Sequence, residues 1–366
     1  MEPLTPPPTN LWKLYCALPA LLPDAGVLYL GAPSAVSRAA LRCHLREQGA
    51  GFTEPFAGVL AVPLRPGLLE RLADRLPADL TEADARGTRA LVAGHGAALT
   101  VADLLNTQPL ATLLAGVRHR WLVEMLREDR LVTHFHPIVR ADDPAEVFGH
   151  ECLVRGVGPT GRLVPPGELF AAAREADLVA PLDRQARQMA LRSAARLGVG
   201  PHLFLNVSPG AIAAPEFSLR TAAGAAAEAE VDPGRVVFEV VESEEVRDVG
   251  RLVRLLDGYR RAGFRVALDD VGAGYNSLTL LTRLRPDFVK LDMELTRGVD
   301  RDRYKARVVG KLLEMARDLG ARTVVEGVET AGEWEWARAH GADFVQGYLF
   351  ARPATPPPVP AVPVAG

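Results

Sequence analysis

Eight polar residues stand out in this 366-residue sequence because each lies inside or just after a run of apolar residues. A carboxylate or an ammonium group that is buried without a partner costs several kcal/mol of folding free energy. These side chains therefore need partners that compensate for their burial. They are Glu151, Asn206, Glu239, Asp269, Asp270, Lys290, Glu326 and Gln346.

The chemistry that these residue types favour is the binding of divalent cations. Five carboxylates converging on one pocket would repel one another unless positive charge neutralised them. Oxygen ligands without cysteine or a pair of histidines favour Mg²⁺ or Mn²⁺ over zinc. The adjacent pair Asp269 and Asp270 suits a carboxylate shared by two ions. Gly272 and Gly274 predict that the strand has already ended at this pair, so that the backbone can aim both carboxylates inward.

Lys290 is the basic residue of the set. The chain has only four lysines among its 42 basic residues, so a lysine beside an apolar run indicates a need for a compact point charge.

Each polar position also has a structural interpretation when it is taken alone. The segment 269–274 suits a surface turn, a glutamate at a strand end is commonly solvated, and Asn206 suits a turn cap. Their recurrence at corresponding places favours one common site.

The elements that must position these side chains are alternating apolar runs and helical stretches. Helices are expected at 168–175, 183–197, 249–262, 306–319 and 331–339, and this alternation is typical of βα units. Eight strands in this pattern predict a (β/α)8 barrel, in which the ends of different strands converge on one mouth. The eight apolar runs are 132–139, 147–154, 203–207, 236–241, 264–268, 288–291, 323–325 and 344–349.

Length and local composition predict two domains framed by tails, because 366 residues at about 150 per domain suggest roughly two. A small α/β domain of regulatory type is expected at 11–115, with an apolar run at 27–30, a helix opened by Ser34 and a further run at 59–64. Nothing in that domain indicates its ligand or signal. The remaining parts are a flexible tail at 1–10, a connecting helix at 116–130, the barrel at 131–353 and a proline-rich tail at 354–366.

Charge and cysteine content limit the possible partners and compartment. A net charge of −3 offers no general attraction to duplex nucleic acid, so any phosphate must be bound locally. Three scattered cysteines predict neither a disulfide framework nor a cysteine metal cluster, which favours a reducing cytoplasm. The apolar stretch 11–30 is interrupted by charged residues and prolines, so neither a signal peptide nor a membrane span is expected.

The ordered motifs from residue 121 to residue 353 resemble the EAL-domain family, the cyclic di-GMP phosphodiesterases. Any one of these motifs is weak evidence, but the ordered set is specific. The family's naming tripeptide reads Glu151-Cys152-Leu153 here. The other matching segments are Val154-Arg155, Leu205-Asn206-Val207-Ser208, Glu239-Val240-Val241-Glu242-Ser243, Asp269-Asp270-Val271-Gly272-Ala273-Gly274, Lys290-Leu291-Asp292, Glu326-Gly327-Val328-Glu329-Thr330 and Gln346-Gly347-Tyr348-Leu349-Phe350.

The resemblance implies a role for each matching residue. One cation would be held by Glu151, Asn206, Glu239 and Asp269, and a second by Asp269, Asp270 and Glu326. Lys290 would orient and polarise the attacking water, Glu242 would anchor the loop that follows Asp270, and Glu329 would support the site from beside it. Substrate contacts would come from Arg155, Leu153, His136, Gln346 and Asp292.

The reaction that the resemblance implies is hydrolysis of one phosphodiester of cyclic di-GMP, which yields linear pGpG. Two bridged divalent ions would remove the repulsion between the anionic ester and hydroxide, so no nucleophilic side chain is needed. Mg²⁺ or Mn²⁺ is expected to support turnover and Ca²⁺ to inhibit it. Similar proteins also imply a homodimer formed through the barrel. A receptor that binds the dinucleotide without turnover, and a barrel enzyme for another phosphate ester, are the alternatives.

Two positions depart from the family pattern. Cys152 replaces the usual alanine, and its side chain is expected to point away from that of Glu151, which implies a small change in packing. His136 stands in Phe135-His136-Pro137-Ile138, where the common sequence is Phe-Gln-Pro-Ile. This histidine is expected to alter contacts to a guanine and to affect substrate affinity more than catalysis.

Overall fold

The computed structural model describes residues 18, 22–23, 25–96, 99–208, 215–241, 248–272 and 277–361. These residues divide into two compact units. The first contains the described residues up to 129 together with 167–178, and the second contains 130–166 and the described residues from 179 onward. The segment 167–178 therefore belongs with the N-terminal unit, although it follows two barrel strands in the sequence.

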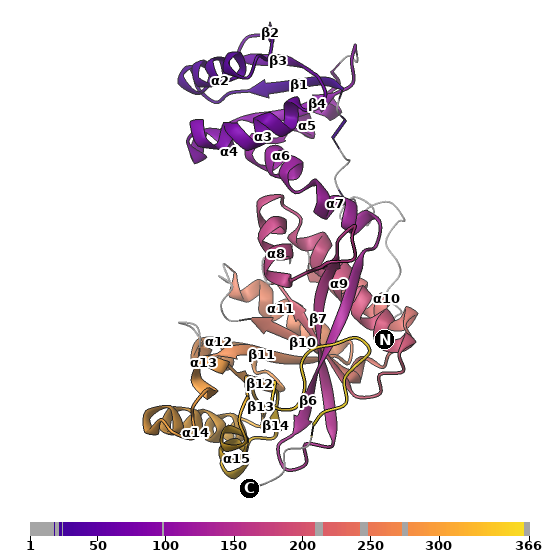
Figure 1. The fold of residues 1–366 in the computed structure, drawn as a ribbon, viewed down its shortest axis with the longest axis vertical. Coiled ribbons are helices and arrows are strands. Elements are labelled where there is room, and N and C mark those ends of the chain that lie inside the picture. The colour runs from indigo at the N-terminus through magenta and orange to yellow at the C-terminus, as the bar shows by residue number, and fades with distance from the viewer. Residues whose placement is uncertain are drawn as a thin grey trace. The chain divides into compact units, whose positions relative to one another are not determined.

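A closed eight-stranded barrel forms the second unit, which confirms the fold class expected from the sequence. The strands close in the order β6-β14-β13-β12-β11-β10-β9-β7, and β7 returns to pair with β6. Figure 1 shows the long strands β6 and β7 side by side. The strands are β6 (Leu131–Arg140), β7 (Val147–Val157), β9 (His202–Val207), β10 (Val236–Val241), β11 (Arg265–Val271), β12 (Phe288–Leu291), β13 (Arg322–Val325) and β14 (Phe344–Val345). A two-residue strand, β8 (Leu163–Val164), adds to the outer side of β7.

One strand differs from the all-parallel arrangement of an ordinary (β/α)8 barrel. β6 is antiparallel to both of its neighbours, β7 and β14, whereas every other neighbouring pair in the barrel is parallel. The physical reason is the connection between β6 and β7, which spans only residues 141–146. A link of that length can reverse the chain into a hairpin, but a parallel return needs a crossover of a dozen or more residues.

Helices pack around the outside of the barrel and enclose its main core. Their inward faces meet strand residues such as Leu205 and Phe238, and Tyr259 on α11 stacks on Phe238 with ring centroids 4.1 Å apart. Within the described ranges, no helix combines the length and the apolar character that crossing a bilayer requires. The helices are α9 (Val179–Arg196), α10 (Pro215–Glu228), α11 (Val249–Arg261), α12 (Ser277–Leu284), α13 (Met293–Thr296), α14 (Arg303–Asp318) and α15 (Ala331–Ala339), with a 3₁₀ turn at Pro233–Arg235.

A second, smaller apolar cluster fills the barrel interior and forms one layer across it. Successive strands each supply one residue to this layer, as expected for a barrel whose interior is packed by side chains. β7 supplies a glycine, Gly149, because a Cβ atom there would come within 2.9 Å of the Phe204 ring. The layer contains Ile138, Phe204, Val237, Ala267, Phe288, Val324 and Phe344.

The N-terminal unit is built on an antiparallel sheet of order β2-β3-β1-β4-β5. Leu28 and Leu30 of β1 are fully buried and alternate with half-buried residues, as the period of two in a strand requires. The helix opened by Ser34 is present as α2, and the Ser34 hydroxyl accepts a hydrogen bond from the Ser37 amide at 3.0 Å. The strands are β1 (Gly26–Gly31), β2 (Thr53–Phe56), β3 (Val59–Leu64), β4 (Arg89–Ala93) and β5 (Gln108–Pro109).

Several helices of this unit pack on the sheet and share its core. α3 and α6 supply apolar residues to the same core as β1 and β3. The region expected as one connecting helix contains two, because the helical run is interrupted at His119 between α6 and α7. The helices are α2 (Ala35–Glu47), α3 (Leu68–Asp79), α4 (Glu82–Gly87), α5 (Val101–Leu105), α6 (Leu110–Arg118), α7 (Arg120–Arg127) and α8 (Pro166–Glu175).

Gly347, which directly follows Gln346, is expected to tolerate no side chain. A Cβ atom at this position would lie 2.0 Å from the backbone oxygen of Val328 and 2.4 Å from its backbone nitrogen. The clash is with backbone rather than with a mobile side chain, so relief requires movement of a chain segment. We expect Gly347→Ala to lower the free energy of unfolding by about 1–3 kcal/mol, measured by urea denaturation.

The matched control is Gly224→Ala on α10, where an added Cβ atom meets nothing within 4 Å. Alanine in an exposed helix interior is more favourable than glycine by about 0.5–1 kcal/mol, so this variant should be slightly more stable than the parent. Equal unfolding curves for Gly347→Ala and the parent protein would contradict the predicted clash.

Asp84 links two helices of the N-terminal unit, and its contribution to stability should depend on pH. The Ser37 hydroxyl and the Thr81 hydroxyl each donate to its carboxylate at 2.6 Å, and these hydrogen bonds lower the pKa of Asp84 below 3.8. A carboxyl group whose pKa is lower in the folded state stabilises the protein at pH values above its unfolded-state pKa. This contribution is lost as the pH falls through the folded-state pKa. Asp84→Asn should therefore be destabilising at pH 7 and less so at pH 3, as urea unfolding would show. The exposed Asp74→Asn is the control, and an Asp84→Asn effect that is the same at both pH values would refute this origin.

Candidate metal centre

The polar side chains form a second layer inside the barrel, next to the apolar one. Each lies two residues after an apolar-layer position on a parallel strand, and a spacing of two returns a side chain to the same face. Glu239 thus follows Val237, and Lys290 follows Phe288. The parallel strands, or the residues directly after them, contribute Glu151, Asn206, Glu239, Asp269, Lys290, Glu326 and Gln346.

Asp269 follows this regular spacing, because it lies two residues after Ala267, but the adjacent Asp270 does not. The strand does not end before them, contrary to the expectation from Gly272 and Gly274, because β11 continues to Val271. Its pairing with β12 is instead irregular between Leu268 and Val271, and Asp270 has a left-handed backbone with φ of 56°. Aspartate is one of the few residue types that adopt this conformation readily. The irregularity redirects the second carboxylate of the pair, which the strand period would otherwise send to the opposite face.

Lys290 lies at the centre of the polar layer and is almost completely buried, with 1% of its surface exposed. Its Nζ atom lies 2.6 Å from Glu326 Oε1, 2.8 Å from Glu239 Oε1 and 3.0 Å from Asp269 Oδ1. Glu151 Oε2 is farther away, at 4.0 Å. Together these carboxylates outweigh the effect of burial and raise the pKa of Lys290 well above 10.5. The ammonium group is therefore retained as a positive charge inside the barrel.

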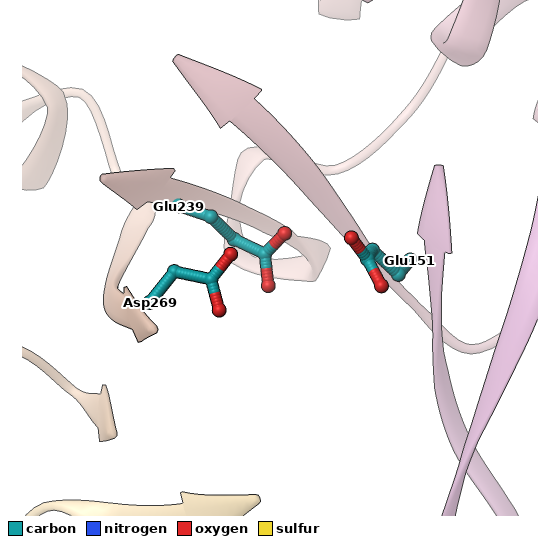
Figure 2. A group of neighbouring side chains, drawn as sticks. All are labelled: Glu151, Glu239 and Asp269. Atoms are coloured by element: carbon teal, nitrogen blue, oxygen red, sulfur yellow. The ribbon is translucent and has the colours of Figure 1, made fainter. Parts of the chain in front are cut away.

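Carboxylates from distant parts of the chain meet in two overlapping groups. Glu151, Glu239 and Asp269 offer oxygen atoms within 4.8 Å of one another, and Asp269, Asp270 and Glu326 form a second group of this kind. Figure 2 shows the first three carboxylates pointing toward one another from separate strands. Asp269 belongs to both groups, so its carboxylate could be shared by two cations, one in each group.

Two amide side chains contact Glu151. Gln346 Nε2 donates to Glu151 Oε2 at 2.9 Å, and Asn206 Nδ2 donates to Glu151 Oε1 at 3.4 Å. Burial opposes the ionisation of Glu151, but the positive charge of Lys290 and the hydrogen bonds from both amides outweigh it and lower the pKa of this carboxyl. Glu151 is thus held in its charged form. Both amide side chains face it with their nitrogen atoms rather than with their oxygen atoms.

The other acids of the site are less readily ionised. Burial raises the pKa values of Glu239 and Glu326 well above 4.5, although Lys290 opposes the change, and it also raises the pKa of Asp269. Burial, reinforced by the charge of Asp269, raises the pKa of Asp270 to about 6. Burial is thus the main reason that these acids resist ionisation, and the charges of the neighbouring carboxylates add to it.

The residues present fit two hard cations. Five carboxylates surround a single ammonium group, and all of the donor atoms are oxygens, which is the ligand set of Mg²⁺ and Mn²⁺. Apart from its ion pair with Lys290, neither oxygen of the fully buried Glu239 has a hydrogen-bond partner among the described residues. The buried Gln346 Oε1 has none there either. Such acceptor atoms suit bound cations and the water molecules that accompany them.

The expected substrate-binding residues of β7 extend along the same face as Glu151. Leu153 and Arg155 follow it at spacings of two, and the antiparallel register places His136 directly opposite Glu151. Both Leu153 and Arg155 are partly exposed. Burial keeps the pKa of Arg155 below its usual value, although Glu151 counteracts the shift. An extended polar and apolar surface thus adjoins the cluster of acids.

Tyr348 was not singled out from the sequence, although it lies in the Gln346-Gly347-Tyr348 motif. Its ring centroid is 6.0 Å from that of His136, and the guanidinium carbon of Arg352 lies 4.2 Å from the Tyr348 ring centroid. The tyrosine is half exposed, at 48%. An accessible aromatic ring beside a histidine can stack on a planar ligand. Its only signal in the sequence was its position in the motif.

The remaining expected residues lie beside the acid cluster rather than within it. Asp292 follows β12 and caps α13 by accepting a hydrogen bond from the Glu294 amide at 2.7 Å. Glu329 follows Glu326 in the loop before α15 and accepts a hydrogen bond from Arg297 at 2.5 Å. Glu242 lies outside the described residues.

Cys152 points away from the acid cluster, as its place between Glu151 and Leu153 on a strand predicts. Its side chain is 92% buried in the core between barrel and helices, where it joins Phe135, its partner across the hairpin. Burial raises the pKa of this thiol well above 9. The cysteine therefore acts as a small apolar residue in this core.

Comparison with known proteins supports the resemblance found in the motifs. The chain is 29% identical over 258 residues to MucR of Pseudomonas aeruginosa, which is named a bifunctional diguanylate cyclase/cyclic di-GMP phosphodiesterase. The aligned residues make up 68% of this chain and 36% of that protein. It is 30% identical over 242 residues to the cyclic di-GMP phosphodiesterase NbdA of the same organism, 63% of this chain and 30% of that protein. The chain thus spans about a third of the length of these curated relatives.

Solved structures share the fold of the barrel. A standalone EAL protein from Vibrio cholerae O395, in its c-di-GMP-bound form, matches with a TM-score of 0.56 and 33% identity over 61% of this chain and 92% of that one. The c-di-GMP complex of the phosphodiesterase PaMucR matches with a TM-score of 0.58 and 27% identity over 66% of this chain and 96% of that one. The model of the EAL domain family matches residues 119–353, which include the whole polar layer. Because this match covers more than half of the sequence, the chain belongs to the EAL domain family.

Proposed function

We propose that this protein hydrolyses cyclic di-GMP to linear pGpG with the help of two divalent cations, Mg²⁺ or Mn²⁺. The observation that carries the proposal is the pair of overlapping carboxylate groups that share Asp269 beside the buried Lys290. The phosphodiesterase names of MucR and NbdA and the c-di-GMP complexes of similar barrels support the choice of substrate. No position of the family's ligand set is missing from the sequence.

The ligands are assigned by the two carboxylate groups and their neighbouring amides. Glu151, Asn206, Glu239 and Asp269 are proposed to hold one cation, and Asp269, Asp270 and Glu326 the other. When bound, two such cations neutralise the acids, lower the pKa of water and stabilise charge on the leaving oxygen. They would thus provide positive charge locally in a chain whose net charge is −3.

Lys290 is proposed to orient the attacking water. Its ammonium group has three N–H donors, and these face Glu239, Asp269 and Glu326. One donor would become free for a water molecule when a bound cation takes over one of these carboxylates. A compact ammonium group suits this crowded position better than the broader guanidinium group of arginine. The substrate would stay fixed while the water approaches the phosphorus atom opposite the leaving oxygen.

The substrate side of the proposal uses the face of the β6–β7 hairpin. Arg155 is proposed to bind a phosphate oxygen, and Leu153 and His136 to contact the remainder of the dinucleotide. Gln346 would bind from the floor of the site through its Oε1 atom, because its Nε2 atom already donates to Glu151. Asp292 is also proposed to contact the dinucleotide. Glu329 is proposed to support the site from beside it, and Glu242 to anchor the loop that follows Asp270.

Assembly and location are part of the same proposal. The protein is proposed to form a homodimer through the barrel, to act in the cytoplasm and to have no need of duplex nucleic acid. The scattered cysteines and the small negative net charge support the last two points. The N-terminal unit is proposed to be regulatory.

Removal of one proposed cation ligand should abolish turnover. We expect Glu151→Ala to lower the rate of pGpG formation by more than about 100-fold, because loss of even an outer-shell group commonly costs about 10–100-fold. The assay is chromatography of the products with Mg²⁺ or Mn²⁺, and substitution of Ca²⁺ should stop the reaction. The control is Glu146→Ala, whose exposed carboxylate lies in the turn between β6 and β7.

Two results would overturn this function. Tight binding of cyclic di-GMP by the parent protein without turnover in either metal would identify a receptor instead of an enzyme. Equal turnover of a generic ester such as bis(p-nitrophenyl) phosphate would indicate an enzyme without preference for the cyclic dinucleotide.

Replacement of His136 by glutamine should change substrate binding more than catalysis. His136 lies opposite Glu151 but outside the two carboxylate groups, so the substitution leaves the proposed ligands in place. We expect His136→Gln to change KM several-fold while kcat stays near the parent value, as measured by steady-state kinetics. Cys152→Ala, on the opposite face of β7, should change neither constant. A loss confined to kcat in His136→Gln would show that the histidine takes part in the chemical step.

A further inference from the structure

A buried ion pair on α9 lies next to the end of the strand that carries Asn206. Asp183 and Arg187 are one helical turn apart, and their relative exposures are only 4% and 8%. Asp183 Oδ2 is paired with Arg187 Nη1, and Asp183 Oδ1 accepts a hydrogen bond from the Ser208 backbone amide at 3.2 Å. One carboxylate therefore binds both a helix side chain and the strand end.

The end of β9 has ladder support on one side only. Its pairing with β7 stops at Phe204, opposite Glu151, whereas its pairing with β10 continues to Val207. Asn206 lies in the stretch beyond Phe204, and Ser208 is the last described residue before a gap at 209–214. Among the described residues, the hydrogen bond to Asp183 is the contact that fixes the Ser208 amide from outside the ladder.

Stability alone does not account for a buried charge pair at this place. Replacing such a pair by apolar side chains of similar volume is often neutral or stabilising, because ion-pair attraction barely offsets the loss of hydration. Positional control is a better account, since a charged acceptor forms a stronger and more directional hydrogen bond to an amide than a neutral one. The amide that it fixes belongs to the second residue after Asn206.

We propose that Asp183 is a positioning residue for the metal centre: by fixing the Ser208 amide, it sets the direction in which Asn206 points. Arg187 supplies the counter-charge that lets the carboxylate remain buried. Asn206 in turn donates to Glu151 at 3.4 Å, so a shift of the β9 end would move two proposed cation ligands together. The inference rests on the proposed function in taking Asn206 and Glu151 as cation ligands.

Two double variants separate the hydrogen bond from the charge pair. Asp183→Asn/Arg187→Met removes both charges but keeps an oxygen that can accept from the Ser208 amide. Asp183→Leu/Arg187→Met removes the same charges and has a side chain of similar size without an acceptor. Their difference therefore reports the acceptor alone. If the leucine variant does not fold, Asp183→Ala in the same Arg187→Met background replaces it, because a methyl group introduces no steric conflict.

The measurements are Mn²⁺ binding by titration calorimetry and hydrogen exchange of the metal-free protein. We expect the leucine or alanine variant to bind Mn²⁺ about tenfold more weakly than the asparagine variant, the lower limit of typical outer-shell effects. The backbone amides of residues 205–208 should also exchange faster in the leucine or alanine variant than in the asparagine variant. The exchange rates of the β12 amides should be the same in both. The asparagine variant should retain most of the parent's Mn²⁺ affinity.

The outcomes distinguish this inference from the proposed function. Equal Mn²⁺ affinity and equal exchange at 205–208 in both double variants would overturn the role of Asp183 and leave the function intact. Weakened binding that is the same in both would assign the effect to the lost charges and would also overturn it. If the parent protein bound no Mn²⁺, the proposed function would fail, and the positioning role with it.

Discussion

The structure depends on the gathering of like charges inside a closed barrel. Five carboxylates gather near a single buried ammonium group, that of Lys290. Glu239 and Asp269 are themselves buried. Their mutual repulsion and desolvation oppose folding unless positive charge is supplied. The raised pKa values of Glu239, Asp269 and Glu326 are the direct expression of this cost. A cluster of carboxyl groups that resist ionisation for this reason also favours the binding of cations.

The rest of the barrel makes this concentration of charge possible. An apolar layer that includes Phe204 and Phe288 closes the interior next to the polar layer, and strand pairing keeps the two layers in register. Contacts from the surrounding helices fix the ends of the strands, where pairing stops. Asp183 binds the amide after β9, and Glu333 of α15 accepts hydrogen bonds from three amides, those of residues 298, 329 and 330. The helices thus act on the site through the backbone of its loops.

The chain belongs to the EAL domain family, and some of its relatives are named cyclic di-GMP phosphodiesterases. The chain keeps every acid of the motif set and departs at positions that surround it. Cys152 is accommodated in the outer core, whereas His136 joins the interior face opposite Glu151. The first departure therefore concerns packing, and the second concerns the surface that a substrate would meet.

Residue types and their order in the sequence determined the family, the closed barrel and the residues worth examining. A period of two identifies an interior side chain, and apolar runs alternating with helices define a barrel, because both patterns arise from local geometry. The same period also explains why Cys152 faces away from Glu151. Local patterns of this kind need no knowledge of distant residues.

Only the tertiary structure decided how these residues meet. The hairpin that makes β6 antiparallel, the left-handed backbone of Asp270 and the contact of Lys290 with acids from three other strands arise from pairing between distant segments. The same holds for Asp183, whose partner amide is 25 residues away in the chain. Such contacts depend on closure of the barrel, which fixes distances between strand ends that no local pattern encodes.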